Sequence, residues 1–95
     1  IADGIAASEA GEVVDARGCF VIPGLIQAHT HLVQCLFRGL ADDLELLDWL
    51  KKKIWPFEAA HNEASVRASA RIGLMEMQLL GTTSILDMGT TKLHE

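Results

Sequence analysis

The sequence predicts an α/β fold in which parallel strands are joined by helices. Two short apolar segments, residues 25–31 and 82–88, are typical of buried strands, and the chain between them has the apolar spacing of helices. The composition agrees, because 49% of the 95 residues are hydrophobic and 22% are charged, as in ordinary globular proteins. A chain of this length suits one small domain, or part of a larger one, and not two domains.

Residues 1–24 are expected to form short strands separated by turns. Turns are predicted where glycine stands among small or charged residues: Asp3 and Gly4, Glu9 to Gly11, and Arg17 and Gly18. Residues 12–15 and 19–22 then form strands, since both are short and rich in β-forming residues. Pro23 and Gly24 end the second strand and redirect the chain, so we place a boundary after this pair.

Residues 25–31 are mostly apolar, without the polar alternation of a half-solvated strand, so we expect a strand covered on both faces. Side chains alternate along a strand, which places His29 and His31 on one face together with Leu25 and Gln27. The residues between them point to the other face. A long connection is expected to follow.

The first predicted helix covers about residues 43–54. Asp42 or Asp43 can cap its N-terminus, because a short carboxylate accepts hydrogen bonds from the free backbone N–H groups there. Apolar residues follow at intervals of three and four: Leu47, Leu50 and Ile54. Lysines lie near the C-terminal end, where their positive charge interacts favourably with the negative end of the helix dipole. The pair Trp55 and Pro56 is expected to end the helix.

The second predicted helix covers residues 62–80, between an N-cap at Asn62 and a stop at Gly81. Its apolar and small residues recur at helical spacing: Val66, Ala70, Gly73, Leu74, Met77 and Leu80. The β-rich residues 82–88 follow at once, which makes a right-handed βαβ unit with parallel strands. Parallel strands are normally buried on both faces, so we expect further strands from a longer chain, or self-association.

The charge distribution excludes two classes of partner. The net charge is −5, and the one basic run, residues 51–53, follows several acidic side chains, so neither nucleic acid nor an anionic membrane is expected to bind. The sequence has no apolar stretch of ~20 residues and no signal-peptide pattern, and we expect a cytoplasmic protein. Two cysteines, Cys19 and Cys35, do not make a disulfide scaffold.

His29 and His31 stand at the carboxyl end of the first predicted strand, where active sites form in parallel α/β barrels. Two imidazoles at this spacing can reach one cation, and imidazole suits zinc and iron. Two ligands do not complete the three or four that a zinc site requires. From spacing alone, two unrelated core or surface histidines therefore remain the alternative.

Residues 21–31 have the pattern apolar-Pro-Gly-apolar-apolar-x-x-His-x-His, and this resembles the point where metal-dependent amidohydrolases pass from a β-sandwich subdomain into their barrel. The similarity continues through four further segments: residues 37–44, 48–50, 54–58 and 81–88. Together they resemble the branch of methylthioadenosine/S-adenosylhomocysteine deaminases, 5'-deoxyadenosine deaminases and triazine chlorohydrolases. The resemblance implies an N-terminal fragment of a (β/α)8 barrel, with residues 25–95 as its first βαβ unit and residues 1–24 as the end of the β-sandwich.

The same resemblance implies a set of site residues. His29 and His31 become ligands of a divalent metal, with zinc as the first expectation and iron as the alternative. Glu58, in the sequence Pro-Phe-Glu, corresponds to the glutamate that holds the ribose hydroxyls, although a solvated glutamate after a helix is the alternative. Trp49 lines the pocket or belongs to the core, and Gln34 stands where some guanine-type deaminases read the base.

Other polar residues receive structural roles. Arg38 is expected to anchor its loop through an ion pair with Asp42 or Asp43, and Cys35 to be a small buried hydrophobe. Two histidines match no ligand position and are expected to be solvated: His61 and His94.

The implied reaction is metal-activated hydrolysis of a C–N or C–Cl bond in a purine nucleoside or related N-heterocycle. The family takes two further histidines, an aspartate and a proton-shuttling glutamate from later strands. We therefore expect this chain to be inactive alone, to belong to a longer protein, since it begins with Ile1, and to form a homo-oligomer. The alternative is a truncated amidohydrolase-derived protein with a structural, binding or oligomerisation role.

Overall fold

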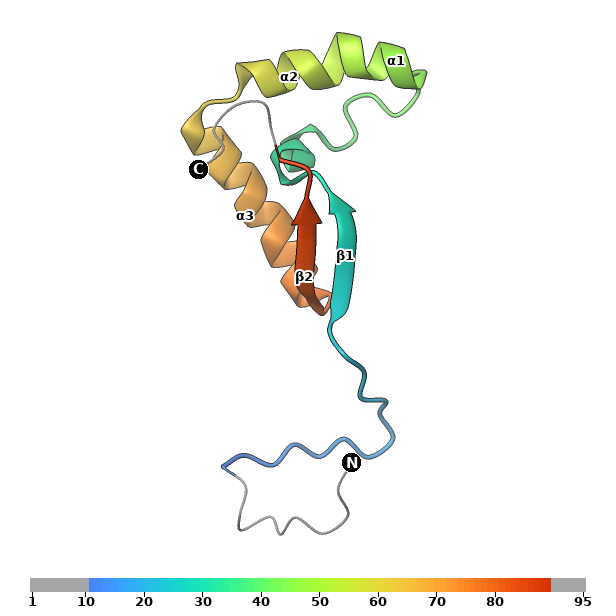
Figure 1. The fold of residues 1–95 in the computed structure, drawn as a ribbon, viewed down its shortest axis with the longest axis vertical. Helices are drawn as coiled ribbons and strands as arrows, with labels where there is room; N and C mark the ends of the chain where they lie inside the picture. The colour runs from blue at the N-terminus through green and yellow to red at the C-terminus, as the bar shows by residue number, and fades with distance from the viewer. Residues whose placement is uncertain (1–10, 90–95) are drawn as a thin grey trace.

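The computed structural model describes residues 11–89, in which a run of helices connects two strands (Figure 1). The elements in order are β1 (Leu25–Thr30), the 3-10 helix η2 (Leu32–Phe37), α1 (Leu46–Trp49), the π-helix η3 (Leu50–Ile54), α2 (Trp55–Ala60), α3 (Glu63–Leu79) and β2 (Thr82–Asp87). The turn predicted at residues 3–4, the turn predicted at residues 9–11 except for Gly11, and the prediction for His94 lie outside the described residues.

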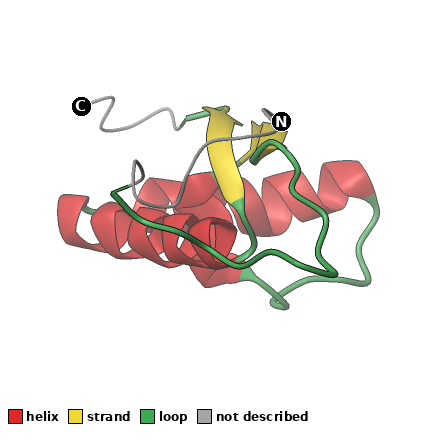
Figure 2. Cartoon of the chain, turned by 90° about the horizontal axis from the view of Figure 1, so that it is seen from below, coloured by secondary structure: helices red, strands yellow, loops and turns green. Residues whose placement is uncertain are grey.

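β1 and β2 pair in parallel and lie within the two strand ranges expected from the sequence. Thr30 lies opposite Asp87 at the carboxyl ends of both strands. At the other end the chain enters β1 through Gly24, where a Cβ would overlap the side chain of Thr83, so only glycine fits. The helices lie on one side of the strand pair (Figure 2). This mixed helix and strand arrangement contains the expected parallel pair, whereas a closed barrel stays a prediction.

Residues 11–24 run as an extended segment away from the rest of the described chain (Figure 1). The strands predicted at residues 12–15 and 19–22 are therefore wrong for this structure, because no neighbouring strand pairs with either segment within residues 11–89. The predicted turn does form: Cys19 N–H donates to Ala16 O at 3.0 Å, and Gly18 adopts a φ of 78°. The assignment of residues 1–24 to a β-sandwich stays a prediction.

The first helical stretch differs from its predicted range of 43–54, because α1, η3 and α2 follow one another from Leu46 to Ala60. Neither Asp42 nor Asp43 caps it, since the N-cap residue is Glu45.

The expected end at Pro56 is also wrong. In η3 the Trp55 N–H donates to Leu50 O, five residues back, and this wider turn accommodates a proline ring that would clash in a regular helix.

η2 lies where only a long connection was expected, and α3 holds it in place. Ser69, fully buried on α3, donates to Leu32 O at 2.7 Å and accepts from Leu36 N–H at 3.3 Å. α3 itself begins and ends as its caps predict: Asn62 and Ser65 form a capping box, and Gly81, with a φ of 84°, follows its last turn.

The described residues bury a small core, whose hydrophobic members are Leu32, Val33 and Ile54. β1 is not covered on both faces as expected, because five of its six residues are exposed and only Thr30 is buried. Leu80, which was predicted to belong to the buried apolar face of the second helix, is 76% exposed, so that part of the prediction is wrong. Parallel strands are stable when both faces are covered, and within residues 11–89 the helices cover one side. No helix of this part of the chain is long and apolar enough to cross a membrane.

Candidate metal and substrate site

His29 and His31 meet at the carboxyl end of β1. Their Nε2 atoms lie 3.0 Å apart, and the rings stand edge to face with centroids 4.9 Å apart. His29 is exposed and His31 is half-buried. The alternation expected along the strand thus places both imidazoles on one face, with their Nε2 atoms converging.

This spacing fits two ligands of one metal ion. Zinc lies about 2.0–2.1 Å from each imidazole nitrogen, so two nitrogens 3.0 Å apart subtend an angle of about 95° at the ion. The same distance also suits a hydrogen bond between one protonated and one unprotonated Nε2. Among residues 11–89, no group of three or more His, Cys, Asp or Glu side chains gathers as a metal site. The described chain therefore offers two ligands.

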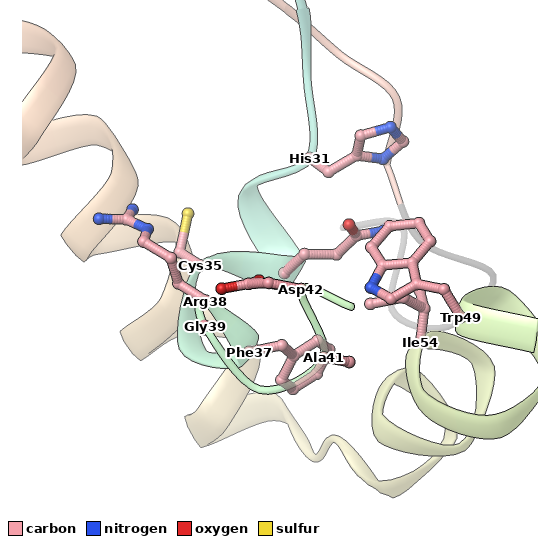
Figure 3. Close-up of a pocket in the computed structure, with 10 residues that line it drawn as sticks. His31, Cys35, Phe37, Arg38, Gly39, Ala41, Asp42, Trp49 and Ile54 are labelled. Atoms are coloured by element: carbon pink, nitrogen blue, oxygen red, sulfur yellow. The ribbon is translucent and has the colours of Figure 1, made fainter. Parts of the chain in front are cut away.

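His31 also lines a pocket of about 280 Å³ at the carboxyl end of β1. The lining residues come from the end of β1, η2, the loop after η2, α1 and η3: His31, Gln34, Cys35, Phe37, Arg38, Gly39, Ala41, Asp42, Trp49 and Ile54. Figure 3 shows His31 and Trp49 on one side of the pocket, with Cys35 and Arg38 on the other. Three of the five site residues predicted from the sequence thus surround one space.

Glu58 reaches this site through Gln34. The Gln34 side-chain amide donates to Glu58 Oε1 at 2.8 Å, and both side chains are half-buried. This hydrogen bond joins η2 to α2 across 24 residues of sequence. Glu58 is therefore not the fully solvated glutamate that was the alternative. Gln34 and Glu58, which the sequence analysis proposed separately as substrate-binding residues, are in contact with each other.

Trp49 lies at the end of α1 and borders two hollows. Besides the pocket with His31, it lines a second one of about 400 Å³ together with Ala41, Asp42, Leu44 and Leu46. Its side chain is half-buried, whereas the buried hydrophobic core consists of other residues. The position gives an apolar wall against which a flat ring can lie.

His61 is not solvated as the sequence suggested. Its Nε2 donates to Val33 O at 2.8 Å, its Nδ1 lies 2.7 Å from Ser65 Oγ, and its ring stacks on Phe37 with centroids 4.9 Å apart. The reason is the longer helical stretch, which ends at Ala60 and turns His61 back over η2. His61 thus joins the start of α3 to the helix that carries Gln34.

Arg38 pairs with Glu76 of α3 and not with Asp42 or Asp43. Two hydrogen bonds of 3.0 and 2.8 Å join the guanidinium to both carboxylate oxygens. They lower the pKa of Glu76 below its ordinary value and raise that of Arg38. Both side chains are about half exposed, so the pair orients the loop beside the pocket more than it stabilises the fold.

Cys35 is half-buried and lies beside Gly73 of α3, so the expectation of a buried side chain is wrong. Its Sγ would lie 2.7 Å from a Cβ placed on Gly73, and its thiol is free in the part of the chain that the structure describes.

Asp87 is a site residue that the sequence reasoning missed. Its Oδ1 accepts the Leu32 N–H at 2.9 Å, directly after His31, and its Oδ2 accepts the Gly89 N–H at 3.2 Å. The available signal was its place at the end of the second strand, because carboxyl ends of adjacent parallel strands share one edge of a sheet.

The comparisons agree with the sequence resemblance. Residues 20–94 match the amidohydrolase family. A 5-methylthioadenosine/S-adenosylhomocysteine deaminase of Halobacterium salinarum is 52% identical over 77 residues, which are 81% of this chain and 18% of the relative. A 5'-deoxyadenosine deaminase of Methanothrix thermoacetophila is 47% identical over 77 residues, 81% of this chain and 19% of the relative. A 5-methylthioadenosine/S-adenosylhomocysteine deaminase of Bacillus cereus is 46% identical over 80 residues, 84% and 18% of the two chains.

The chain therefore spans less than a fifth of the length of the curated relatives that it matches. The matching family is generally metal-dependent.

Proposed function

The chain belongs to the amidohydrolase family, and on that premise we propose that it carries one part of the active site of a metal-dependent nucleoside deaminase. The observation that supports this most is the convergence of His29 and His31, whose Nε2 atoms lie 3.0 Å apart beside a pocket. The substrate class is a purine nucleoside or related N-heterocycle, and hydrolysis of a C–N bond releases ammonia. The names of the similar relatives favour this over C–Cl hydrolysis.

Different described residues are proposed to bind the metal, the heterocycle and the sugar. His29 and His31 would hold a divalent metal, zinc first and iron as the alternative, through their Nε2 atoms. When bound, such a metal supplies the Lewis acidity that makes water a nucleophile at neutral pH. Trp49 offers an apolar wall for the heterocycle, and the Glu58 carboxylate accepts hydrogen bonds from sugar hydroxyls.

Gln34 acts on the substrate through Glu58. Its amide donates to Oε1 of that carboxylate, so it restricts the rotation of the group that would bind the sugar. A carboxylate has about four lone-pair directions, so one donor from Gln34 leaves acceptor capacity for two hydroxyl groups. We therefore assign Gln34 to sugar positioning, in place of the base reading that the sequence suggested.

Metal binding by the full chain tests the first half of the proposal. Equilibrium dialysis against zinc should load the wild-type chain. His29→Ala or His31→Ala should each weaken binding by at least the roughly tenfold that losing an outer-shell partner costs, since each removes a direct ligand. His94→Ala removes one imidazole from elsewhere in the sequence and is the matched control. Equal zinc content in all four proteins would contradict a metal role for the pair.

Catalysis tests the second half. The described residues offer two metal ligands, so we expect the full chain with zinc to release no ammonia from adenosine-type nucleosides. A chimera should be active if residues of this chain replace the 77 matched residues of the Halobacterium salinarum relative. His29→Ala in that chimera should abolish turnover. Turnover by this chain alone, or an active His29→Ala chimera, would refute the assignment.

A further inference from the structure

The carboxyl end of β1 is fastened to β2 on both sides of His31. On one side the Met88 N–H donates to Thr30 O at 2.9 Å. On the other side the Leu32 N–H donates to Asp87 Oδ1 at 2.9 Å. The two residues flanking His31 in the sequence are therefore both held by the end of the neighbouring strand.

The second of these hydrogen bonds replaces a helix cap that His31 does not provide. His31 is the N-cap residue of η2, and its side chain makes no capping hydrogen bond to the described residues. The first N–H groups of a helix lack partners inside the helix, and a Ser, Thr, Asp or Asn at the N-cap usually accepts from one of them. Here Asp87, 55 residues further along the chain, supplies the acceptor.

This division of roles leaves the His31 imidazole available for another partner. Its Nε2 lies 3.0 Å from that of His29. Leu32 is held a second time, because the buried Ser69 hydroxyl donates to its carbonyl oxygen at 2.7 Å. Because both the N–H and the C=O of Leu32 are hydrogen-bonded, the peptide bond between His31 and Leu32 is held in place.

We propose that Asp87 is a positioning residue for the metal site: through Leu32 it fixes the backbone that carries the His31 imidazole, without contacting the metal. The proposal rests on the proposed metal role of His29 and His31. It differs from two other roles of a carboxylate near a cation, which are direct ligation and long-range attraction by its charge.

Two variants separate these roles in the full chain. Asp87→Asn keeps an oxygen acceptor for the Leu32 N–H and removes the charge, whereas Asp87→Glu keeps the charge and displaces the acceptor by one methylene. Zinc titration, followed by the ¹⁵N shifts of the His29 and His31 rings, should give an affinity for Asp87→Asn close to that of wild type. Asp87→Glu should bind about tenfold more weakly, the lower end of the effect of losing an outer-shell partner.

The opposite pattern would overturn the proposal, because weak binding by Asp87→Asn and normal binding by Asp87→Glu means that charge or ligation matters. Equal affinities, or a loss in both variants, would overturn it as well. Hydrogen exchange of the Leu32 amide, measured without metal, gives a second readout. It compares wild type with Asp87→Asn, so it does not depend on whether Asp87→Glu folds. This amide should be protected in wild type and in Asp87→Asn, and fast exchange in both would also overturn the proposal.

Failure of the proposed function is recognisable separately. If His29→Ala binds zinc as wild type does, the metal role of the histidines is wrong, whatever the Asp87 variants show. The exchange rate of the Leu32 amide still reports whether Asp87 holds this peptide.

Discussion

Replacing Gly73 by alanine tests the contact between α3 and η2 from which the site is built. A Cβ at this position would lie 2.7 Å from Cys35 Sγ and 2.9 Å from Leu32 Cδ2. Non-bonded heavy atoms normally approach to about 3.5–4.0 Å, so the side chains of Cys35 and Leu32, or α3 and η2 themselves, must move by several tenths of an ångström. Because Leu32 follows His31, the displacement also reaches the imidazole pair.

The magnitude follows from two opposing terms. Alanine is favoured over glycine inside a helix by about 1 kcal/mol. Overpacking of a close contact costs about 1–3 kcal/mol. We therefore expect Gly73→Ala to destabilise the fold by about 1 kcal/mol, whereas a helical glycine with free space would be stabilised by about the same amount.

Urea denaturation of the full chain, monitored by circular dichroism, measures this difference. Ala68→Gly, at an exposed position of the same helix, is the matched control and should cost about 1 kcal/mol from helix propensity alone. Cys35→Ala should relieve part of the Gly73→Ala penalty, since it removes the sulfur atom nearest to the new Cβ. A Gly73→Ala chain more stable than wild type would refute the reasoning.

Three further predictions concern side chains around the pocket. In the chimera, Glu58→Gln should raise KM for a ribonucleoside about tenfold or more, since a hydrogen bond to a charged group contributes about 1.5–3 kcal/mol, and should leave KM for a 2',3'-dideoxy analogue unchanged. Arg38→Ala should reduce the loss of thermal stability in acid. Arg38 lowers the pKa of Glu76 in the folded chain, so the pair contributes stability above pH 4.5, the ordinary pKa of a glutamate, and this stability is lost as the pH falls from 4.5 through the lowered pKa. Comparable acid melting curves would contradict this. His61→Ala should lower stability by about 1–3 kcal/mol by leaving the carbonyl of Val33 without its partner, and an unchanged urea midpoint would refute it.

Local signals in the sequence predicted the elements whose ends are determined by neighbouring residues. The N-cap at Asn62 and the stop at Gly81 bound α3 in the structure as the sequence pattern predicted, and the capping box with Ser65 is an addition that the structure reveals. The end expected at Pro56 was wrong, because that expectation assumed regular α-helical hydrogen bonds. A π turn before the proline removes the conflict, and the residue pattern did not reveal it.

Partners far apart in the sequence were not predictable from spacing. η2 is held by Ser69, 37 residues after Leu32, and Arg38 finds Glu76 at a separation of 38 residues. For Arg38 the nearby aspartates were the simpler expectation. Which acid it meets depends on how closely α3 packs on η2, and that distance is determined by the missing side chain of Gly73.

For the candidate site, the sequence predicted that His29 and His31 share one face of the strand, because strand alternation is a local rule, and their metal role stays a prediction. It named Gln34 and Glu58 as separate candidates, and their mutual hydrogen bond depends on how α2 crosses η2.

The arrangement of burial explains why the histidine pair is well placed although most of β1 is exposed. Leu25 and Ile26, at the start of the strand, are 51% and 75% exposed. Thr30, Leu32 and Val33, which surround His31 in the sequence, are buried. The position of the imidazoles is therefore determined by the packing of η2 on α3 and by the hydrogen bonds from the end of β2. A two-stranded sheet with one open face would not by itself hold two side chains with the accuracy that a metal requires.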